Sequence, residues 1–269
     1  MRIENFLKIK NTMNNFEIFN FNSPLSILLV SFFFIALTYS SVGFGGGSSY
    51  LAILALLTVD FHLMRSTALL CNIVVVTGGV YIFYKEGKLD LKKSWPLVFS
   101  SVPMAYVGGL WPIKQEAFFI LLGVILVVVS LLLWLQPEKN STHNNQKFNT
   151  LFFKIGVGGF LGLLYGLVGI GGGIFLSPIL HFIRWDEAKK ISAIASFFIL
   201  VNSVSGLAGQ LQQHGTFEWT FTLPLLLAVL VGGQIGSRLG AQKFNPIYVK
   251  RITAILILVA GSKILIDHL

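Results

Sequence analysis

The sequence predicts an all-α polytopic membrane protein, built from two inverted repeats of about four full spans each plus glycine-broken half-helices, about 8 to 10 membrane segments in all. The first reason is composition: of 269 residues, 54% are hydrophobic and only 12% are charged, and the mean hydropathy is +0.76. Soluble domains carry about 25% charged residues, so this composition excludes an ordinary soluble enzyme and a disordered protein.

The second reason is the spacing of the charged residues, which leaves apolar intervals of about the 20 residues that cross a bilayer. Examples are the intervals from Arg65 to Lys85 and from Lys93 to Lys114. Residues 18–59 and 155–183 form much longer charge-free intervals, and each has a glycine cluster near its middle. We therefore expect both long intervals to be interrupted at their glycines.

The third reason is an internal repeat around these clusters. Residues 39–47 read YSSVGFGGG and residues 165–173 read YGLVGIGGG, at an offset of 126 residues. Asp90 and Pro96 recur as Glu218 and Pro224 at an offset of 128. Chance similarity between apolar segments is the alternative, but the glycines, acids and prolines recur in the same order, which favours a duplication.

The polar segments divide the chain. Residues 1–22 are rich in Asn and Phe and are predicted to be an N-terminal lead-in, without a clean signal-peptide cleavage site. Residues 136–150 contain a Pro and many Asn and are predicted to be a polar cytoplasmic linker. The two membrane repeats are then residues 23–135 and 151–269.

The basic residues orient the two repeats. Lys and Arg gather in residues 85–93, in the linker, in residues 184–190 and in residues 238–251, which the positive-inside rule places in the cytoplasm. Arg65 is interpreted as one of the few basic residues that flank the spans on the opposite side. This pattern inverts the two halves and predicts a multi-pass protein of the plasma (inner) membrane.

The glycine clusters are the candidate binding site, because irregular backbone inside a bilayer must be buried in protein or line a wet cavity. Helices that start after each cluster, at Ser48 and Ile174, would direct unpaired N–H groups and a partial positive charge at the centre. Two such ends from inverted halves predict a midplane site for a small anion. Tight packing of small residues between helices is the alternative. The candidate glycines are Gly43, Gly45, Gly46, Gly47, Gly169, Gly171, Gly172 and Gly173.

The polar residues within the spans support an anionic substrate. Carboxylates are almost absent from the apolar segments, whereas cation and proton-coupled transporters usually need one there. Ser48, Asn72 and Asn202 are the candidate side-chain ligands, with interhelical hydrogen bonding as the alternative for each. The lipid bilayer is the second predicted partner, and the sequence leaves the oligomeric state open.

Other classes of function find little support. Ser48 and Ser177 lie near glycines without a histidine at a matching depth, so no catalytic residue and no enzyme are predicted. The histidines lack metal-ligand spacing and Cys71 is the single cysteine, so neither a metal site nor a cofactor is predicted. The basic residues lie between apolar runs, which argues against nucleic-acid binding.

The duplicated G-x-G-G-G cluster, the half-length repeat and the chain length resemble the TauE/SafE family of sulfite exporters, over residues 23–269. The second cluster is followed by Ser177-Pro178-Ile179-Leu180, close to the family pattern, whereas Ala52 stands where the first cluster would have its proline. The resemblance implies a carrier for sulfite, sulfonates or related sulfur-containing or organic anions that works by alternating access. A passive anion channel and a non-transporting membrane assembly factor remain the alternatives.

Overall fold

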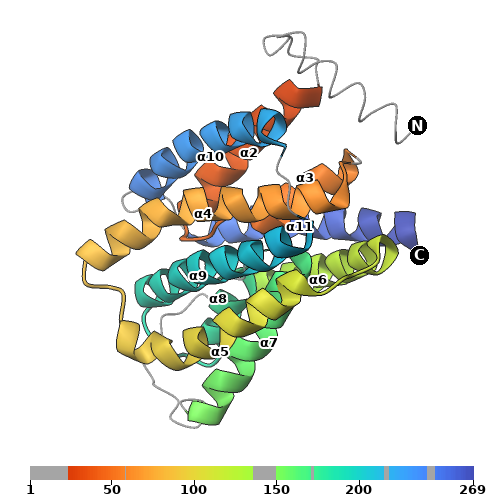
Figure 1. The fold of residues 1–269 in the computed structure, drawn as a ribbon. Helices are drawn as coiled ribbons and strands as arrows, with labels where there is room; N and C mark the ends of the chain where they lie inside the picture. The colour runs from red at the N-terminus through yellow and green to blue at the C-terminus, as the bar shows by residue number, and fades with distance from the viewer. Residues whose placement is uncertain (1–23, 58, 136–149, 171–172, 215–217, 241–245) are drawn as a thin grey trace.

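The computed structural model describes residues 24–57, 59–135, 150–170, 173–214, 218–240 and 246–269 (Figure 1). These residues form α-helices and contain no strand, so the all-α prediction is confirmed for them. The predicted lead-in, residues 1–22, and residues 136–149 of the predicted linker lie outside the described residues. The helices are α2 (Pro24–Ser40), α3 (Gly47–Leu56), α4 (Phe61–Lys85), α5 (Leu91–Leu110), α6 (Gln115–Leu135), α7 (Leu151–Val168), α8 (Gly173–Phe182), α9 (Ala188–His214), α10 (Trp219–Gly240) and α11 (Pro246–His268).

Several helix starts follow from single polar residues. Asp60 caps α4 by accepting hydrogen bonds from the amides of His62 and Leu63, at 3.0 and 3.1 Å. Asp90 caps α5 in the same way through the Lys93 amide, at 3.1 Å. Asp90 and Glu218, the two acidic residues that recur in the sequence, hold the same position in each half, because Asp90 directly precedes α5 and Glu218 directly precedes α10.

The membrane character of the helices is evident from their length and composition. Five helices of the described ranges are long and apolar enough to cross a bilayer: α4, α6, α7, α9 and α10. Helices α2 and α3 are apolar but shorter. Large apolar side chains such as Phe99, Phe160 and Leu227 are more than half exposed, which suits a surface that faces lipid. The prediction of a polytopic membrane protein is confirmed, while the number of full spans stays a prediction.

The tryptophans also divide as an interface belt requires, with one exception. Trp95, Trp111, Trp134 and Trp219 lie near helix ends and are 54% to 64% exposed. Trp185 is instead buried, with the Lys154 ammonium 4.7 Å from the centre of its ring. Trp185 therefore belongs to the contact between the α8–α9 connection and α7 rather than to the outer belt.

Both long apolar intervals are broken at their glycines, as the sequence predicts. Residues 41–46 separate α2 from α3, and residues 169–172 separate α7 from α8. The helices after the breaks begin at Gly47 and Gly173, each one residue before the expected start. Each half of the chain thus contributes one short helix of 10 residues that begins at its glycine cluster.

Helices of one half of the chain pack mainly against helices of the other half. Helix α5 packs against α7, and α10 packs against α2, so the fourth helix of each half contacts the first helix of the other. Helices α4 and α9 lie side by side and run in opposite directions, and α6 packs against α11 (Figure 1). Contacts that come in matching pairs are what two related halves would produce, although the inverted repeat itself stays a prediction.

Small residues allow α5 and α7, and likewise α2 and α10, to approach each other closely. A Cβ atom added at Gly166 of α7 would lie 2.0 Å from the Ala105 carbonyl oxygen of α5. A Cβ atom added at Gly236 of α10 would lie 2.1 Å from the Leu37 carbonyl oxygen of α2. Without side chains at these positions the backbones are in direct contact, which is how helices associate when no hydrophobic effect drives them together in lipid.

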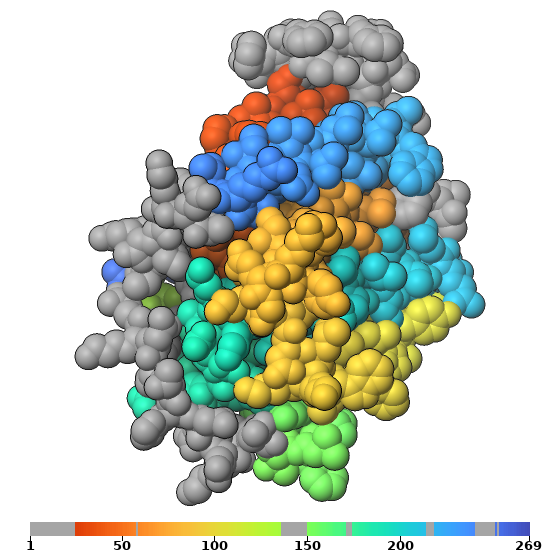
Figure 2. All heavy atoms as spheres, turned by 90° about the vertical axis from the view of Figure 1, so that its left-hand side faces the viewer, coloured from red at the N-terminus to blue at the C-terminus, as the bar shows by residue number. Residues whose placement is uncertain are grey.

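The basic segments of both halves gather at one end of the molecule. Lys93, at the start of α5, forms a 2.8 Å ion pair with Asp186 in the α8–α9 connection. The predicted cytoplasmic segments 85–93 and 184–190 therefore lie on the same side. Figure 2 shows this end, where the α4–α5 connection lies between the end of α10 and the start of α7.

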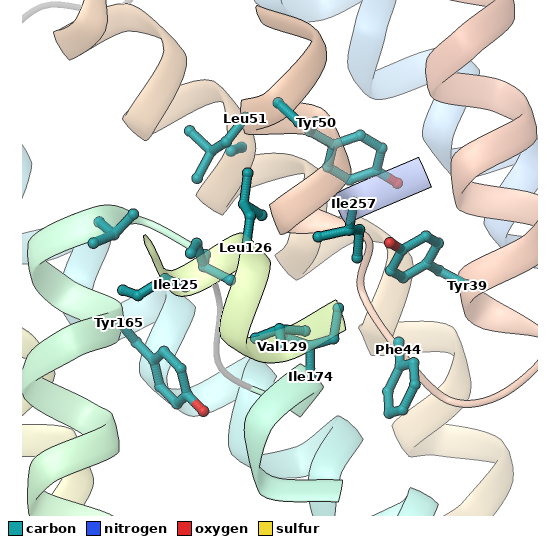
Figure 3. Close-up of a cluster of buried hydrophobic side chains, with 14 of the residues drawn as sticks. Tyr39, Phe44, Tyr50, Leu51, Ile125, Leu126, Val129, Tyr165, Ile174 and Ile257 are labelled. Carbon is teal, nitrogen blue, oxygen red and sulfur yellow. The ribbon is translucent and has the colours of Figure 1, made fainter. Parts of the chain in front are cut away.

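The buried core links the two short helices through α6 and α11. In Figure 3, Ile125 and Val129 of α6 lie among side chains of both halves, including Leu51 of α3 and Ile174 of α8. Ile257 of α11 occupies the same cluster. The starts of the short helices are thus held by apolar packing on one side, which leaves α4 and α9 to contact the glycine turns on the other.

Candidate functional site

The first glycine turn depends on backbone conformations that glycine adopts without strain. Gly43 and Gly46 have φ angles of 83° and 88°, in the left-handed region. The Gly43 amide donates to the Ser40 carbonyl at 3.1 Å, which closes the end of α2. Gly46 then caps α3 without any side-chain hydrogen bond. The first amides of α3 therefore have no side-chain acceptor from the cap.

The second turn begins in the same way. Gly169 has a φ angle of 82°, and its amide donates to the Tyr165 carbonyl at 2.7 Å. Gly169 thereby ends α7 directly, whereas Gly43 lies three residues after Ser40, the last residue of α2. Gly171 and Gly172 lie outside the described residues, and Gly173 begins α8.

Each turn is supported by the long central helix of the opposite half. A Cβ atom at Gly43 would lie 3.0 Å from the Ser192 Cβ atom of α9, and the Ser196 hydroxyl donates to the Gly43 carbonyl at 2.6 Å. A Cβ atom at Gly169 would lie 3.2 Å from the Arg65 carbonyl oxygen of α4. Arg65 and Ser192 therefore occupy equivalent positions at the two turns.

Asn72 of α4 joins the two turns. Its Nδ2 donates to the Ile170 carbonyl of the second turn at 3.1 Å. A Cβ atom at Gly45 of the first turn would lie 2.4 Å from the Asn72 Oδ1 atom, and one at Gly47 would lie 2.4 Å from the Ile170 carbonyl oxygen. The turns are therefore in direct contact, with the Asn72 amide packed between them.

Two buried polar atoms at this contact lack hydrogen-bond partners. They are the Ser48 hydroxyl, in the first turn of α3, and the Asn72 Oδ1 atom. Both residues are at most 1% exposed. Buried polar groups are nearly always paired, so these unpaired atoms make the junction of the two helix breaks a candidate site for a further molecule.

Asn202, the other predicted amide ligand, has a different environment. Its Nδ2 donates to the Ser101 hydroxyl of α5 at 3.0 Å and to the Phe198 carbonyl at 2.8 Å, while its Oδ1 atom, like that of Asn72, is buried without a hydrogen-bond partner. These bonds join α9 to α5, whereas Asn72 contacts both glycine turns. The structure thus brings Asn72 and Ser48 to the turns, and its hydrogen bonds place Asn202 in a helix contact.

Arg65 is the residue that the sequence analysis missed. The sequence predicts a residue that flanks a span, whereas the structure places Arg65 in the second turn of α4 and leaves it 2% exposed; its side of the membrane stays a prediction. It is the one charged side chain among the buried residues of the described ranges. A helical spacing of seven residues places Arg65 on the same face of α4 as Asn72, and that spacing is the signal that could have found it.

The surface charges of the basic end differ from this buried one. Partial burial raises the pKa of Asp186, but hydrogen bonds from Lys93, the Glu187 amide and Lys190, together with the Lys93 charge, outweigh it. The pKa of Asp186 therefore lies below its usual value. Within the described residues, no group of three or more His, Cys, Asp or Glu side chains is arranged to hold a metal ion.

Comparison with known proteins identifies the family of this chain. The sequence profile of the family described as sulfite exporter TauE/SafE matches residues 28–264. The chain belongs to the TauE/SafE family. The match includes both glycine turns, α4 and α9, so the contacts described above lie within the family's common region.

Relatives of this TauE/SafE protein match nearly end to end. A probable membrane transporter protein of Sinorhizobium fredii, y4hK, is 30% identical over 88% of this chain and 97% of its own length. The probable membrane transporter proteins YunE and YjnA of Bacillus subtilis are 24% and 26% identical, over 87% and 90% of this chain and 95% and 99% of their own lengths. No solved structure matches the chain.

Proposed function

We propose that this TauE/SafE protein is a plasma-membrane transporter that carries a small anion such as sulfite, a sulfonate or a related sulfur-containing or organic acid by alternating access. The observation that supports the proposal most directly is the Asn72 amide packed between two helix breaks from different halves of the chain. A binding site shared between two halves changes its accessibility when one half rotates against the other.

The hydrogen-bond donors at the turns suit an anion. Helix α3 begins at Gly47 with a cap that offers no side-chain acceptor, and the first of its amides to donate to the Gly46 carbonyl is that of Ser49, so the amides of Gly47 and Ser48 and the partial positive charge of the helix would face a ligand. The unpaired Ser48 hydroxyl adds a donor. The Asn72 Oδ1 atom is an acceptor and requires a donor in return, which a protonated anion such as hydrogensulfite would provide.

The charges of the buried residues also favour an anion. Arg65 is the buried charged side chain of the described ranges, and no described carboxylate is buried with it. A cation carrier would need acceptor or acidic groups at this depth. The names of the relatives y4hK, YunE and YjnA describe membrane transporters without naming a substrate, so the anion class rests on the description of the family as sulfite exporters and on the chemistry of these side chains.

The test is transport by the purified full-length protein in proteoliposomes, measured with ³⁵S-labelled sulfite. We expect saturable uptake that unlabelled sulfite or a sulfonate inhibits, and accumulation against a gradient when a coupling ion gradient is imposed. Saturable flux that never exceeds equilibrium under any imposed gradient would indicate a passive channel. No flux, together with no thermal stabilisation by sulfite, thiosulfate, sulfonates, sulfate or short carboxylates, would favour a non-transporting factor.

A further inference from the structure

We propose that Arg65 binds the negative charge of the transported anion and selects anions over neutral molecules. This inference rests on the proposed function and names the residue that provides its charge selectivity. It assigns the two halves unequal roles, because the equivalent position in the second half is Ser192, which carries no charge.

The contacts of Arg65 leave part of its guanidinium unused. Its Nη2 donates to the Gly166 carbonyl of α7 at 3.1 Å, and the centre of the guanidinium lies 5.9 Å from the middle of the Phe118 ring of α6. Its Nε atom is buried without a hydrogen-bond partner. The planar guanidinium therefore has a donor that an oxyanion can occupy, and its fork of N–H groups matches the oxygens of a sulfite or sulfonate.

The charge itself has no partner either. Among the described residues, no carboxylate lies within the 4.0 Å distance of an ion pair with Arg65, and the pairs that Asp186 forms are with Lys93 and Lys190. Burying a cation without a counter-ion is strongly unfavourable, even when one carbonyl accepts a bond from it. An anionic substrate would serve as the missing counter-ion.

A purely structural role does not account for these contacts. Arg65 could serve to cap α7, whose last carbonyl groups lack partners within the helix. The Gly166 carbonyl, however, also accepts from Gln210 Nε2 of α9 at 3.4 Å, so this cap has a neutral donor within reach. A cap would also not require a permanent charge at a position that is 2% exposed.

The position of Arg65 connects it to the turns. Its backbone supports Gly169, where α7 ends, and its side chain lies on the face of α4 that also presents Asn72. Helix α4 thus carries a charge beside the second turn and an amide between both turns, about two helical turns, or 10 Å, apart. Charge selection and the junction of the two halves are therefore coupled through one rigid helix.

The experiment compares Arg65→Gln and Arg65→Lys with Arg238→Gln, which removes an exposed arginine at the end of α10. Sulfite uptake is measured in proteoliposomes over a range of concentrations. We expect Arg65→Gln to raise the half-saturating sulfite concentration at least about tenfold and Arg65→Lys to raise it about threefold, because lysine keeps the charge and loses the fork. Arg238→Gln should change it less than twofold.

A second readout separates binding from folding. In the wild-type protein, methanesulfonate should raise the melting temperature and neutral methanesulfonamide should not, and Arg65→Lys should weaken the response to methanesulfonate. Wild-type half-saturation in either folded variant would overturn the proposal. Loss of folded protein in both variants would also overturn it, since Arg65 would then be a structural cap. If the wild-type protein itself neither transports sulfite nor responds to any anion, the proposed function fails instead.

Discussion

The two glycine turns share a backbone and differ in the side chains that surround them. Gly43 and Gly169 have nearly equal φ angles, 83° and 82°, and each lies against the central helix of the opposite half. The first turn meets Ser192 and accepts a hydrogen bond from Ser196, whereas the second meets Arg65. The two glycine turns therefore share the break, while the residues of α4 and α9 around it differ.

The residues seven positions after Arg65 and Ser192 on the central helices also differ in polarity. Asn72 follows Arg65 on α4, and Ile199 follows Ser192 on α9, and a Cβ atom at Gly45 would contact both Asn72 and Ile199. One side of the junction is thus polar and the other is apolar. A substrate bound at this junction, as we propose, would have a preferred orientation, because its charged and apolar parts would find different neighbours.

The variant with the largest expected effect on transport removes the contact between the two glycine turns. In Gly47→Leu, the new side chain meets the Ile170 carbonyl oxygen and the Asn72 amide, so the turns must separate. We expect sulfite transport to fall about 10- to 100-fold, as overpacking of about 1–3 kcal/mol implies, with membrane insertion retained. Gly79→Leu in α4 is the control, because no atom lies within 4 Å of its added Cβ. Equal transport in both variants would contradict the contact.

The second test makes the polar side of the junction resemble the apolar side. Asn72→Leu removes the hydrogen bond to Ile170 and the unpaired Oδ1 atom. We expect kcat/KM for sulfite transport to fall about tenfold, which corresponds to about 1.4 kcal/mol. Asn202→Leu, which removes bonds between α9 and α5, should have the smaller effect on kcat/KM and the larger one on melting temperature. If Asn202→Leu lowered kcat/KM more than Asn72→Leu, the amide that contacts the substrate would be Asn202 of α9 and not Asn72 of α4.

The third test concerns the hydrogen bond that the first turn receives from α9. Ser196→Ala removes the donor to the Gly43 carbonyl, and we expect stability to fall by about 1 kcal/mol, or roughly 2–4 °C in melting temperature. Ser130→Ala is the matched control, because its buried hydroxyl bonds only to Val127 of its own helix. A loss in the control as large as that in Ser196→Ala would show that the contact between the halves has no special weight.

The smallest test concerns the basic end, where both halves meet through Lys93 and Asp186. Because Lys93 is 45% exposed, the ion pair contributes about 0–1 kcal/mol. Since the folded pKa of Asp186 is lowered, this stability is present above the unfolded pKa of about 3.9 and is lost as the pH falls through the folded value. We expect Asp186→Asn to melt about 1–3 °C below wild type at pH 7, and this difference to shrink as the pH is lowered below about 3.9, with exposed Asp267→Asn unchanged. A constant difference would exclude the carboxylate charge as its cause.

The sequence by itself determined the membrane class and the two helix breaks. A chain with 12% charged residues cannot cover its surface with polar groups, so it must face lipid. Clustered glycines adopt the left-handed φ angles at which an α-helix ends, so they predict the breaks. It also pointed to Asn72, because a buried amide needs several partners. These features depend on local composition and short-range periodicity, which a single sequence records directly.

Only the tertiary structure decided which side chains meet at the turns. Arg65 follows a loop that contains Asp60, and in sequence it resembles other residues that flank a span, yet α7 and α6 cover it. The packing of α5 on α7 and of α10 on α2 is equally non-local, since these helices are far apart in the chain. The environment of a charge depends on the helices that surround it, and a sequence gives their order without giving their neighbours.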